Sequence, residues 1–293
     1  MFQLVYTSSP RLLEAGKTGF GTVARNRQLP APLVSHLERI SSFDRASGIN
    51  SHVYYSVFRM GALYYHIFSR VGDSGVDYTQ RTNHIAHHWI LPDENVTNDG
   101  FSHTTPAGIL QALQNNWLLS WNGNPQWFEE ESYVTAPIIP SQNAWAKLTG
   151  TQENGLWLQS AEFKDGGNIL LPEHCDEHMV LALLHEAFLQ RNDKGWGLGF
   201  TTAADGNLSR MVCPLVCFRH SQISDDSSTQ GGYPHLHIHL GLQPPFVPPP
   251  ASITPRPAMP APQPERQMVS EFHPIEQPQQ INQPPSTSAS PPL

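Results

Sequence analysis

The sequence has few cysteines and no long apolar run. Three cysteines among 293 residues, an odd number, argue against a disulfide framework and suit a reducing compartment. No segment approaches the roughly 20 apolar residues that cross a membrane. The start, MFQLVYTSSPR, lacks the basic leader of a signal peptide. We therefore expect a cytoplasmic protein with no membrane partner.

Basic residues are also few, and they form no cluster. The 17 lysines and arginines are outnumbered by 25 acidic residues, which gives a formal net charge of -8. Neutralisation of nucleic-acid phosphates needs a concentrated basic face. We therefore expect no nucleic-acid partner.

Proline is abundant and is concentrated in one part of the chain. Of the 27 prolines, 16 lie in residues 244–293, where aromatic residues are almost missing. Such a segment cannot bury enough apolar surface to offset the loss of chain entropy. We predict a folded domain over residues 1–243 and a disordered proline-rich tail over residues 244–293.

Hydrophobic periodicity predicts strands and helices that do not alternate regularly. This order favours an α+β fold, with a mixed, mostly antiparallel sheet and packed helices, over a doubly wound parallel sheet. The hairpin predicted at residues 52–70 is apolar on both faces, which is typical of strands in the middle of a covered sheet. Strands are expected at residues 2–7, 21–25, 52–60, 62–70, 85–91, 156–163, 167–172, 196–202 and 211–218, and helices at 33–40, 105–113, 141–148 and 176–192.

Two short motifs fail on their spacing. The GKT of Gly16–Thr18 is not a phosphate-binding loop, because the position five residues before Gly16 is Arg11 and not glycine. The LLHEAF segment is not a zinc-protease helix, because the residue four positions after His185 is Leu189. We interpret His185 as a polar residue at the edge of a helix face and expect no cofactor.

Other histidines and cysteines allow a metal site without requiring one. The first group, His174, Cys175 and His178, lies where a helix is expected to begin, so its members can also act in capping. The second group, three histidines from His235 to His239, lies on one side of an extended segment near the proline-rich tail, where incidental histidines are the alternative. We predict no metal site, treat Cys213 and Cys217 as buried thiols, and leave open whether the second group binds a metal. The two groups are His174, Cys175 and His178, and His235, His237 and His239.

The segment RTNHIAHHWIL, residues 81–91, is the richest in reactive groups. As a strand it carries His84 and His88 on one face and His87 on the other. Arginine can bind a carboxylate or phosphate, aspartate can orient a histidine, and asparagine can hydrogen-bond a substrate. The candidate catalytic residues are Asp77, Arg81, Asn83, His84 and His88, with help from Tyr6 or Arg25.

A structural interpretation of the same segment stays open. The histidines can be buried with hydrogen-bonded ring nitrogens, and an arginine can hold a loop through backbone carbonyls. Chain order alone does not distinguish this arrangement from a catalytic one.

Three segments resemble the N-terminal domain of the bacterial GTPase-associated protein family, a component of predicted GTPase-centred conflict systems. They are QLVYTSSPRLLEAGKTGFGTVAR, DYTQRTNHIAHHWIL and WGLGFTT, and the likeness covers roughly residues 1–218. The resemblance implies a role in a defence or signalling assembly with a GTPase and effector-type proteins as partners. It carries no catalytic residues across.

Two functions follow from these observations. The leading hypothesis is an interaction or adaptor component, with a rigid domain and an extended tail that spans distance. The alternative is an enzyme, a hydrolase or transferase, that uses the cluster around residues 81–88. The enzyme requires these side chains to converge in an open pocket.

Overall fold

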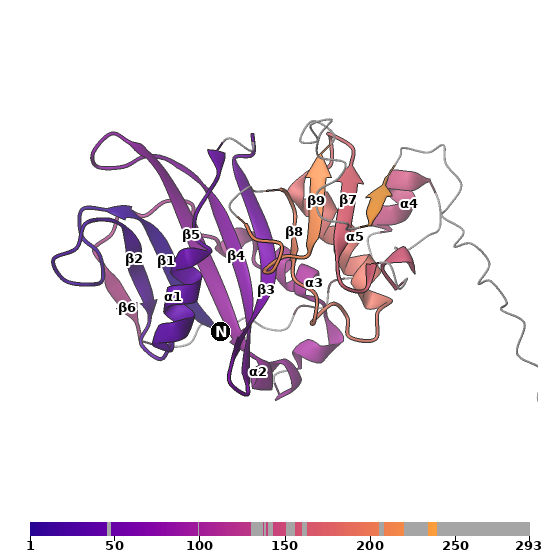
Figure 1. Ribbon diagram of the computed structural model, residues 1–293, viewed down its shortest axis with the longest axis horizontal. Coiled ribbons are helices and arrows are strands. Elements are labelled where there is room, and N and C mark those ends of the chain that lie inside the picture. Colours follow the sequence, from indigo (N-terminus) through magenta and orange to yellow (C-terminus); the bar gives the residue numbers. More distant parts are fainter. Residues whose placement is uncertain are drawn as a thin grey trace, which may run out of the picture. The chain divides into compact units, whose positions relative to one another are not determined.

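The structure of the protein is a computed structural model that describes residues 1–45, 48–98, 100–129, 137, 139, 143–150, 156–159, 163–204, 208–219 and 234–238 (Figure 1). These residues lie in one compact unit, Met1–Phe246. The predicted boundary at residue 243 and the predicted tail, residues 244–293, lie outside the described residues. The division into a domain and a tail therefore stays a prediction.

A 10-stranded sheet forms the body of this unit, in the order β10-β7-β9-β8-β3-β4-β5-β1-β2-β6. Neighbouring strands from β8 through β3, β4, β5 and β1 to β2 are antiparallel. The strands β10, β7, β9 and β8 run parallel to one another, and β6 runs parallel to β2. This arrangement confirms the predicted α+β class with a mixed, mostly antiparallel sheet. The strands are β1 (Phe2–Ser9), β2 (Gly19–Asn26), β3 (Ser51–Met60), β4 (Leu63–Val76), β5 (Thr82–Pro92), β6 (Gln126–Phe128), β7 (Gly167–Leu171), β8 (Phe200–Thr201), β9 (Leu215–Arg219) and β10 (His235–His237).

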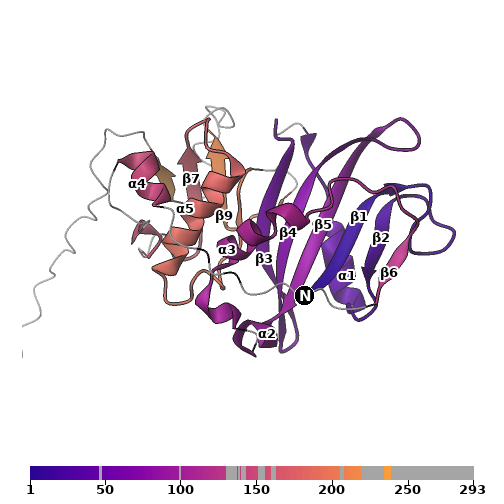
Figure 2. The same ribbon diagram turned by 180° about the vertical axis from the view of Figure 1, so that it is seen from behind.

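Helices cover both faces of the sheet. The helix α1 lies on one face, and α3 and α5 lie on the opposite face (Figures 1 and 2). The α-helices are α1 (Ala31–Arg39), α2 (Asp93–Asn98), α3 (Pro106–Ala112), α4 (Ala144–Thr149) and α5 (Glu177–Leu189), and the 3-10 helices are η2 (Phe101–His103), η3 (Gln114–Asn116) and η4 (Leu156–Gln159).

Successive residues of β3 enter different hydrophobic cores. Tyr54 belongs to the core that includes Leu33 and Leu37 of α1. Val53 and Tyr55 belong to the core that includes the buried sides of α3 and α5. Side chains of a strand alternate between faces, and here both faces are covered, so the strand is apolar along its length. The expected place of residues 52–70 in the middle of a covered sheet is confirmed.

The helix starts follow their local sequence. Thr105 Oγ1 accepts a hydrogen bond from the Gly108 amide at 3.0 Å, and Pro106 occupies the first turn, where its missing amide costs nothing. Asp176 Oδ1 accepts from the Met179 amide at 2.7 Å and caps α5. These side chains bind amides that have no partner inside their helices.

The strand predicted at residues 156–163 is wrong over its first half. Leu156–Gln159 forms the 3-10 helix η4, and residues 160–162 lie outside the described residues. Arg191 Nη1 donates to the Leu158 carbonyl at 3.0 Å and holds this turn beside α5. In a strand Leu156 and Leu158 would share one face, whereas here Leu156 is 55% exposed and Leu158 is buried, as the tighter turn of a 3-10 helix allows.

Two other predicted strands are shorter than expected. Residues 196–202 contribute only β8, and residues 211–218 enter the sheet only at Leu215. Pro214 precedes Leu215 and has no backbone N–H with which to extend the pairing.

The helix predicted to begin at Ser141 begins at Ala144, and Ser141 lies outside the described residues. The buried carboxylate of Glu186, on α5, accepts from the amides of Ala144 and Trp145 at 2.9 and 3.2 Å. A group distant in sequence therefore fixes the start of α4.

Candidate functional site

His88, on β5, is fully buried on the side of the sheet that α1 covers. Its Nε2 is 2.8 Å from Ser41 Oγ and its Nδ1 is 2.7 Å from Ser69 Oγ. The Ser41 hydroxyl donates its proton to the Leu37 carbonyl at 2.7 Å, so His88 Nε2 donates to Ser41 and Nδ1 accepts from Ser69. Burial lowers the pKa of His88 to about 3, and the ring is neutral.

His87 occupies the opposite face of β5, as the strand pattern predicts. Its Nε2 lies 2.9 Å from Gln3 Oε1, and its Nδ1 accepts from the Leu118 amide at 3.1 Å. Burial lowers the pKa of His87 to about 3. Both ring nitrogens of this neutral histidine therefore have protein partners.

Asp77 organises the turn between β4 and β5. Its Oδ1 accepts from the amide and hydroxyl of Thr79 at 2.7 and 2.6 Å and from the Arg81 amide at 3.0 Å. Its Oδ2 accepts from Ser8 Oγ at 2.9 Å. Hydrogen bonds, led by the one from the Thr79 side chain, lower the pKa of Asp77. This carboxylate stabilises a turn. Within the described residues, it forms no hydrogen bond with His84 or His88.

Asn83 and Arg81 complete the same turn. Asn83 Oδ1 accepts from Thr7 Oγ1 and from the Ser8 amide, each at 3.2 Å, which ties the start of β5 to β1. The Arg81 side chain is 72% exposed, and its Nη2 lies 3.9 Å from Asp77 Oδ2. Arg81 therefore faces solvent, whereas Asn83 is part of the strand pairing.

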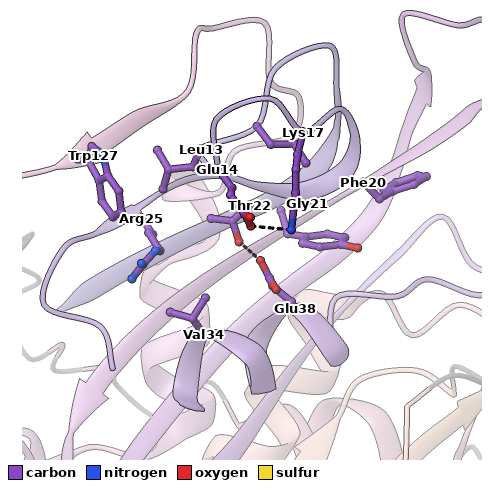
Figure 3. Close-up of a pocket in the computed structure, with 12 residues that line it drawn as sticks. Leu13, Glu14, Lys17, Phe20, Gly21, Thr22, Arg25, Val34, Glu38 and Trp127 are labelled. Atoms are coloured by element: carbon purple, nitrogen blue, oxygen red, sulfur yellow. Dashed lines mark hydrogen bonds and ion pairs between the residues drawn. The ribbon is translucent and has the colours of Figure 1, made fainter. Parts of the chain in front are cut away.

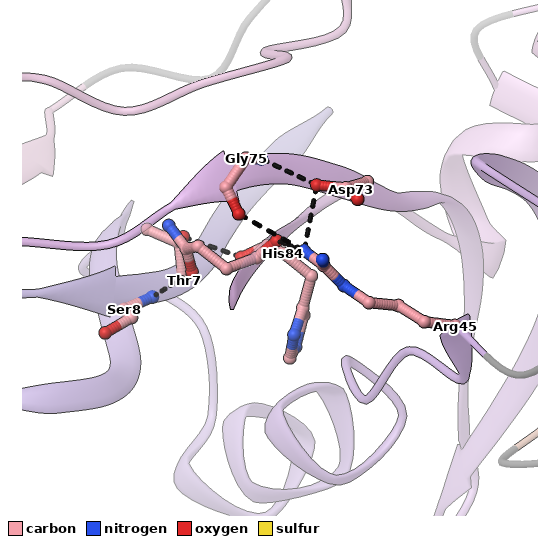
Figure 4. Close-up of polar contacts among 7 residues, drawn as sticks. Thr7, Ser8, Arg45, Asp73, Gly75 and His84 are labelled. Carbon is pink, nitrogen blue, oxygen red and sulfur yellow. Dashed lines mark hydrogen bonds and ion pairs between the residues drawn. The ribbon is translucent and has the colours of Figure 1, made fainter. Parts of the chain in front are cut away.

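Arg45 is a further polar group at this end of the sheet, and Figure 4 shows it reaching across to β4 and β5. Its Nη2 donates to Asp73 Oδ1 at 2.8 Å, to the Gly75 carbonyl at 3.3 Å, and to the Asn83 carbonyl. Sequence reasoning did not single out Arg45, because it follows α1 in a segment that has no motif. An arginine does hold a loop through backbone carbonyls here, but it is Arg45 and not Arg81.

Of the three histidines of β5, His84 is the one that is not fully buried. Its ring stacks on Phe20 with centroids 4.5 Å apart, and the rings of Tyr6 and Phe43 lie 6.2 and 6.4 Å away. Burial, and then the nearby charge of Arg45, lower the pKa of His84, while Asp73 acts in the opposite direction. His84 is half-buried in an aromatic cluster, and Phe20 separates it from a neighbouring groove.

That groove lies between β2, α1 and the loop after β1, and we call it the β2–α1 groove (Figure 3). It encloses about 470 Å³. Phe20 and Trp127 lie towards opposite ends in Figure 3, and Glu38 of α1 points up towards β2. The lining residues are Tyr6, Leu12, Leu13, Glu14, Lys17, Phe20, Gly21, Thr22, Arg25, Val34, Glu38 and Trp127.

Charged and aromatic side chains both line the groove. The guanidinium carbons of Arg25 and Arg27 lie 4.8 and 4.7 Å from the centre of the Trp127 ring. Glu38 Oε1 accepts from Thr22 Oγ1 at 2.6 Å. Burial lowers the pKa of Arg25, and Glu38 opposes that shift. The arrangement offers flat rings, cations and a carboxylate to the same ligand.

Tyr6 and Arg25, predicted as helpers of residues 81–88, both line this groove. Burial, and then Glu38, raise the pKa of Tyr6, and its hydroxyl has no hydrogen-bond partner among the residues that the structure describes. A register shift in the β1–β2 pairing follows Val5 and inserts one residue in β2. In a regular strand Thr22 and Arg25 would lie on opposite faces, because an odd number of positions separates them. The inserted residue changes this alternation, so both side chains line the groove.

His174, Cys175 and His178 do not form a metal centre in the described part of the chain. In the described part of the chain, no group of three or more histidine, cysteine, aspartate or glutamate side chains could hold a metal ion. His185 is buried and not at an exposed helix edge, and its Nδ1 lies 2.7 Å from Thr105 Oγ1. His239 and the side chains of His235 and His237 lie outside the described residues, so metal binding by this group stays open.

No helix in the described segments is long and apolar enough to span a membrane. Cys175, Cys213 and Cys217 are buried free thiols. Burial raises the pKa of Cys217 to about 12. These thiols pack as small apolar groups.

Residues 1–132 match the family described as GTPase-associated protein 1, N-terminal domain type 2. This match confirms the resemblance over residues 1–132 of the predicted range of residues 1–218. The matched segment contains β1–β6 and every lining residue of the β2–α1 groove. No curated protein and no solved structure matches the chain. The family relates the protein to a GTPase-associated system.

Proposed function

We propose that the protein is an interaction component, an adaptor, of a bacterial GTPase-centred defence or signalling system. Its partners are a GTPase and effector-type proteins of the same system, and it acts in the cytoplasm. The β2–α1 groove is the docking surface for the GTPase. The family of residues 1–132 supports the GTPase association, and the groove supports the mode of binding.

One contrast carries this proposal. Asp77, His87 and His88 are engaged in internal hydrogen bonds. The groove instead offers the Phe20 ring, which is 44% exposed, and the Tyr6 hydroxyl, which has no partner in the described part of the chain. Aromatic rings and arginines are enriched at protein interfaces and account for much of their binding energy.

The alternative is an enzyme of the hydrolase or transferase kind. The half-buried ring of His84 favours it, because this histidine lies beside Phe20 at the rim of the groove. Arg81 is exposed, but neither His84 nor Arg81 lines the groove, so a substrate in the groove would have to pass Phe20 to reach them. A general base must lie within hydrogen-bond reach of the proton that it removes. The stacked Phe20 ring between His84 and the groove weakens this alternative.

A binding titration between the purified chain and a purified GTPase of the same system tests the proposal. We expect saturable binding that weakens at least tenfold in Phe20→Ala and in Arg25→Gln, because each variant removes one groove contact. Met211→Ala is the matched control, since Met211 is 95% exposed and does not line the groove. Absence of binding, or equal affinity of all the variants, contradicts the proposal.

A further inference from the structure

A second pocket lies where the sheet changes from parallel to antiparallel. The strands β7, β9 and β8 run parallel, α5 connects β7 to β8, and β3 is antiparallel to β8. The pocket opens beyond the carboxyl ends of β8 and β9, next to the start of α5. It encloses about 270 Å³, and we call it the Arg219 pocket. The residues that line it are Ile49, Asn50, Ser51, Glu177, Thr202, Ala203 and Arg219.

Arg219 lines this pocket, and a second arginine, Arg70, is hydrogen-bonded to a residue of its wall. Arg219 Nη1 donates to the Thr202 carbonyl at 3.4 Å. Arg70 Nη2, from the middle of β4, donates to Ser51 Oγ at 2.9 Å. Burial lowers the pKa of Arg70, and the charge of Glu177 opposes that shift. An arginine held beside a cavity in this way is oriented before any ligand arrives.

Glu177 faces both arginines without forming an ion pair with either. Burial raises the pKa of Glu177, and the positive charges of Arg70 and Arg219 lower it. The negative charge of Asp176 raises this pKa further. Within the described residues, no hydrogen bond or ion pair engages its carboxylate. Asp176 is occupied as the cap of α5. The pocket lining thus contains the half-buried carboxylate of Glu177 and the guanidinium group of Arg219, and Arg70 is hydrogen-bonded to the lining residue Ser51.

We propose that the Arg219 pocket binds a small ligand that carries a carboxylate or a phosphate. Arg219 binds the anionic group, because a guanidinium pairs two N–H groups with two oxygens of such an anion, and Arg70, bonded to Ser51 of the pocket wall, adds a second positive charge. Glu177 accepts a hydrogen bond from a hydroxyl or amine elsewhere on the ligand. The volume lies near the lower limit of about 300 Å³ for small-molecule sites, which fits a small metabolite.

This site is separate from the docking groove. The groove involves β1, β2 and α1, whereas the pocket involves β8, β9 and α5, and the two share no lining residue. In the sheet, β3, β4, β5 and β1 lie between β8 and β2. Ligand binding at the Arg219 pocket can therefore be measured without the GTPase and does not depend on the proposed docking function.

Titration of the full chain with inorganic phosphate and, separately, with succinate tests the proposal, with amide signals of Thr202 and Ala203 followed by NMR. We expect saturable shifts with at least one probe. Saturation by phosphate alone identifies a phosphate-bearing ligand, and saturation by succinate alone identifies a carboxylate. Saturation by both supports the shared anion chemistry. No saturable shift with either probe overturns the proposal.

Two variants decide whether the pocket itself binds the probe. Arg219→Gln should weaken binding at least tenfold, whereas the control Arg27→Gln, at an exposed arginine outside the pocket, should not change it. Glu177→Gln should strengthen binding severalfold, because it removes a negative charge that repels the anion. If Arg219→Gln does not fold, Glu177→Gln decides alone, and an unchanged or weaker affinity in that variant overturns the proposal.

Discussion

Nε2 of His88 lies 2.8 Å from Oγ of Ser41. This contact joins the middle of β5 to Ser41, which lies two residues after the end of α1. Because the Ser41 hydroxyl donates to the Leu37 carbonyl, the direction of each hydrogen bond around His88 is fixed. The ring is a neutral bridge between helix and sheet. A histidine in this position stabilises the fold and does not act as a base.

Replacement of His88 by alanine should lower the free energy of unfolding by about 3 kcal/mol, since it creates a cavity and leaves two buried hydroxyls without their partner. Chemical denaturation measures the change. His103→Ala, at an exposed histidine, is the control and should stay within about 0.5 kcal/mol of the parent. Equal stability of the two variants would refute the structural role of His88.

Acidification should destabilise the fold well before the carboxylates titrate. Burial lowers the pKa of His52, His87 and His88 to about 3 each, whereas an unfolded histidine has a pKa of about 6.5. The unfolded state therefore binds more protons below pH 6.5, and at pH 5 each histidine removes about 2 kcal/mol of stability. Melting temperatures measured from pH 7.5 to pH 4.5 should fall steeply, and a flat profile would contradict the neutral, buried state.

Two replacements of His84 distinguish packing from chemistry. If His84 serves as an aromatic neighbour of Phe20, His84→Phe should retain both the melting temperature and the affinity for the GTPase, while His84→Ala should lower the melting temperature. An enzyme that uses the ring nitrogen requires both variants to lose activity equally. Parallel thermal melts and binding titrations make the comparison. Loss of function in His84→Phe with an unchanged melting temperature would favour the enzyme.

The sequence predicts the strand that carries these histidines and the face of each side chain. Period-2 alternation assigns His84 and His88 to one face and His87 to the other, and the structure agrees. The hydrogen-bond partners were not predictable, because Ser41 is 47 positions from His88 in the chain. Hydrogen bonding to a distant hydroxyl leaves no local pattern in the sequence.

The groove was only partly predictable for a different reason. The sequence predicts Tyr6 and Arg25 as helpers of the histidine segment, but Glu38 and Trp127 carry no signal. The inserted residue in β2 changes which side chains face the groove after Thr22. A strand pattern read without that bulge assigns Thr22 and Arg25 to opposite faces. The site therefore depends on pairing geometry that the composition of the strand does not specify.

Hydrogen–deuterium exchange of the chain, with and without the GTPase, tests the central claim most directly. The account predicts that the GTPase slows amide exchange in β2 and α1, and in the loop between β1 and β2, which together surround the groove. Amides of β7 and β9, in the other half of the sheet, should exchange at an unchanged rate. Protection confined to β7 and β9, or no protection at a saturating concentration of the GTPase, would contradict docking at the β2–α1 groove.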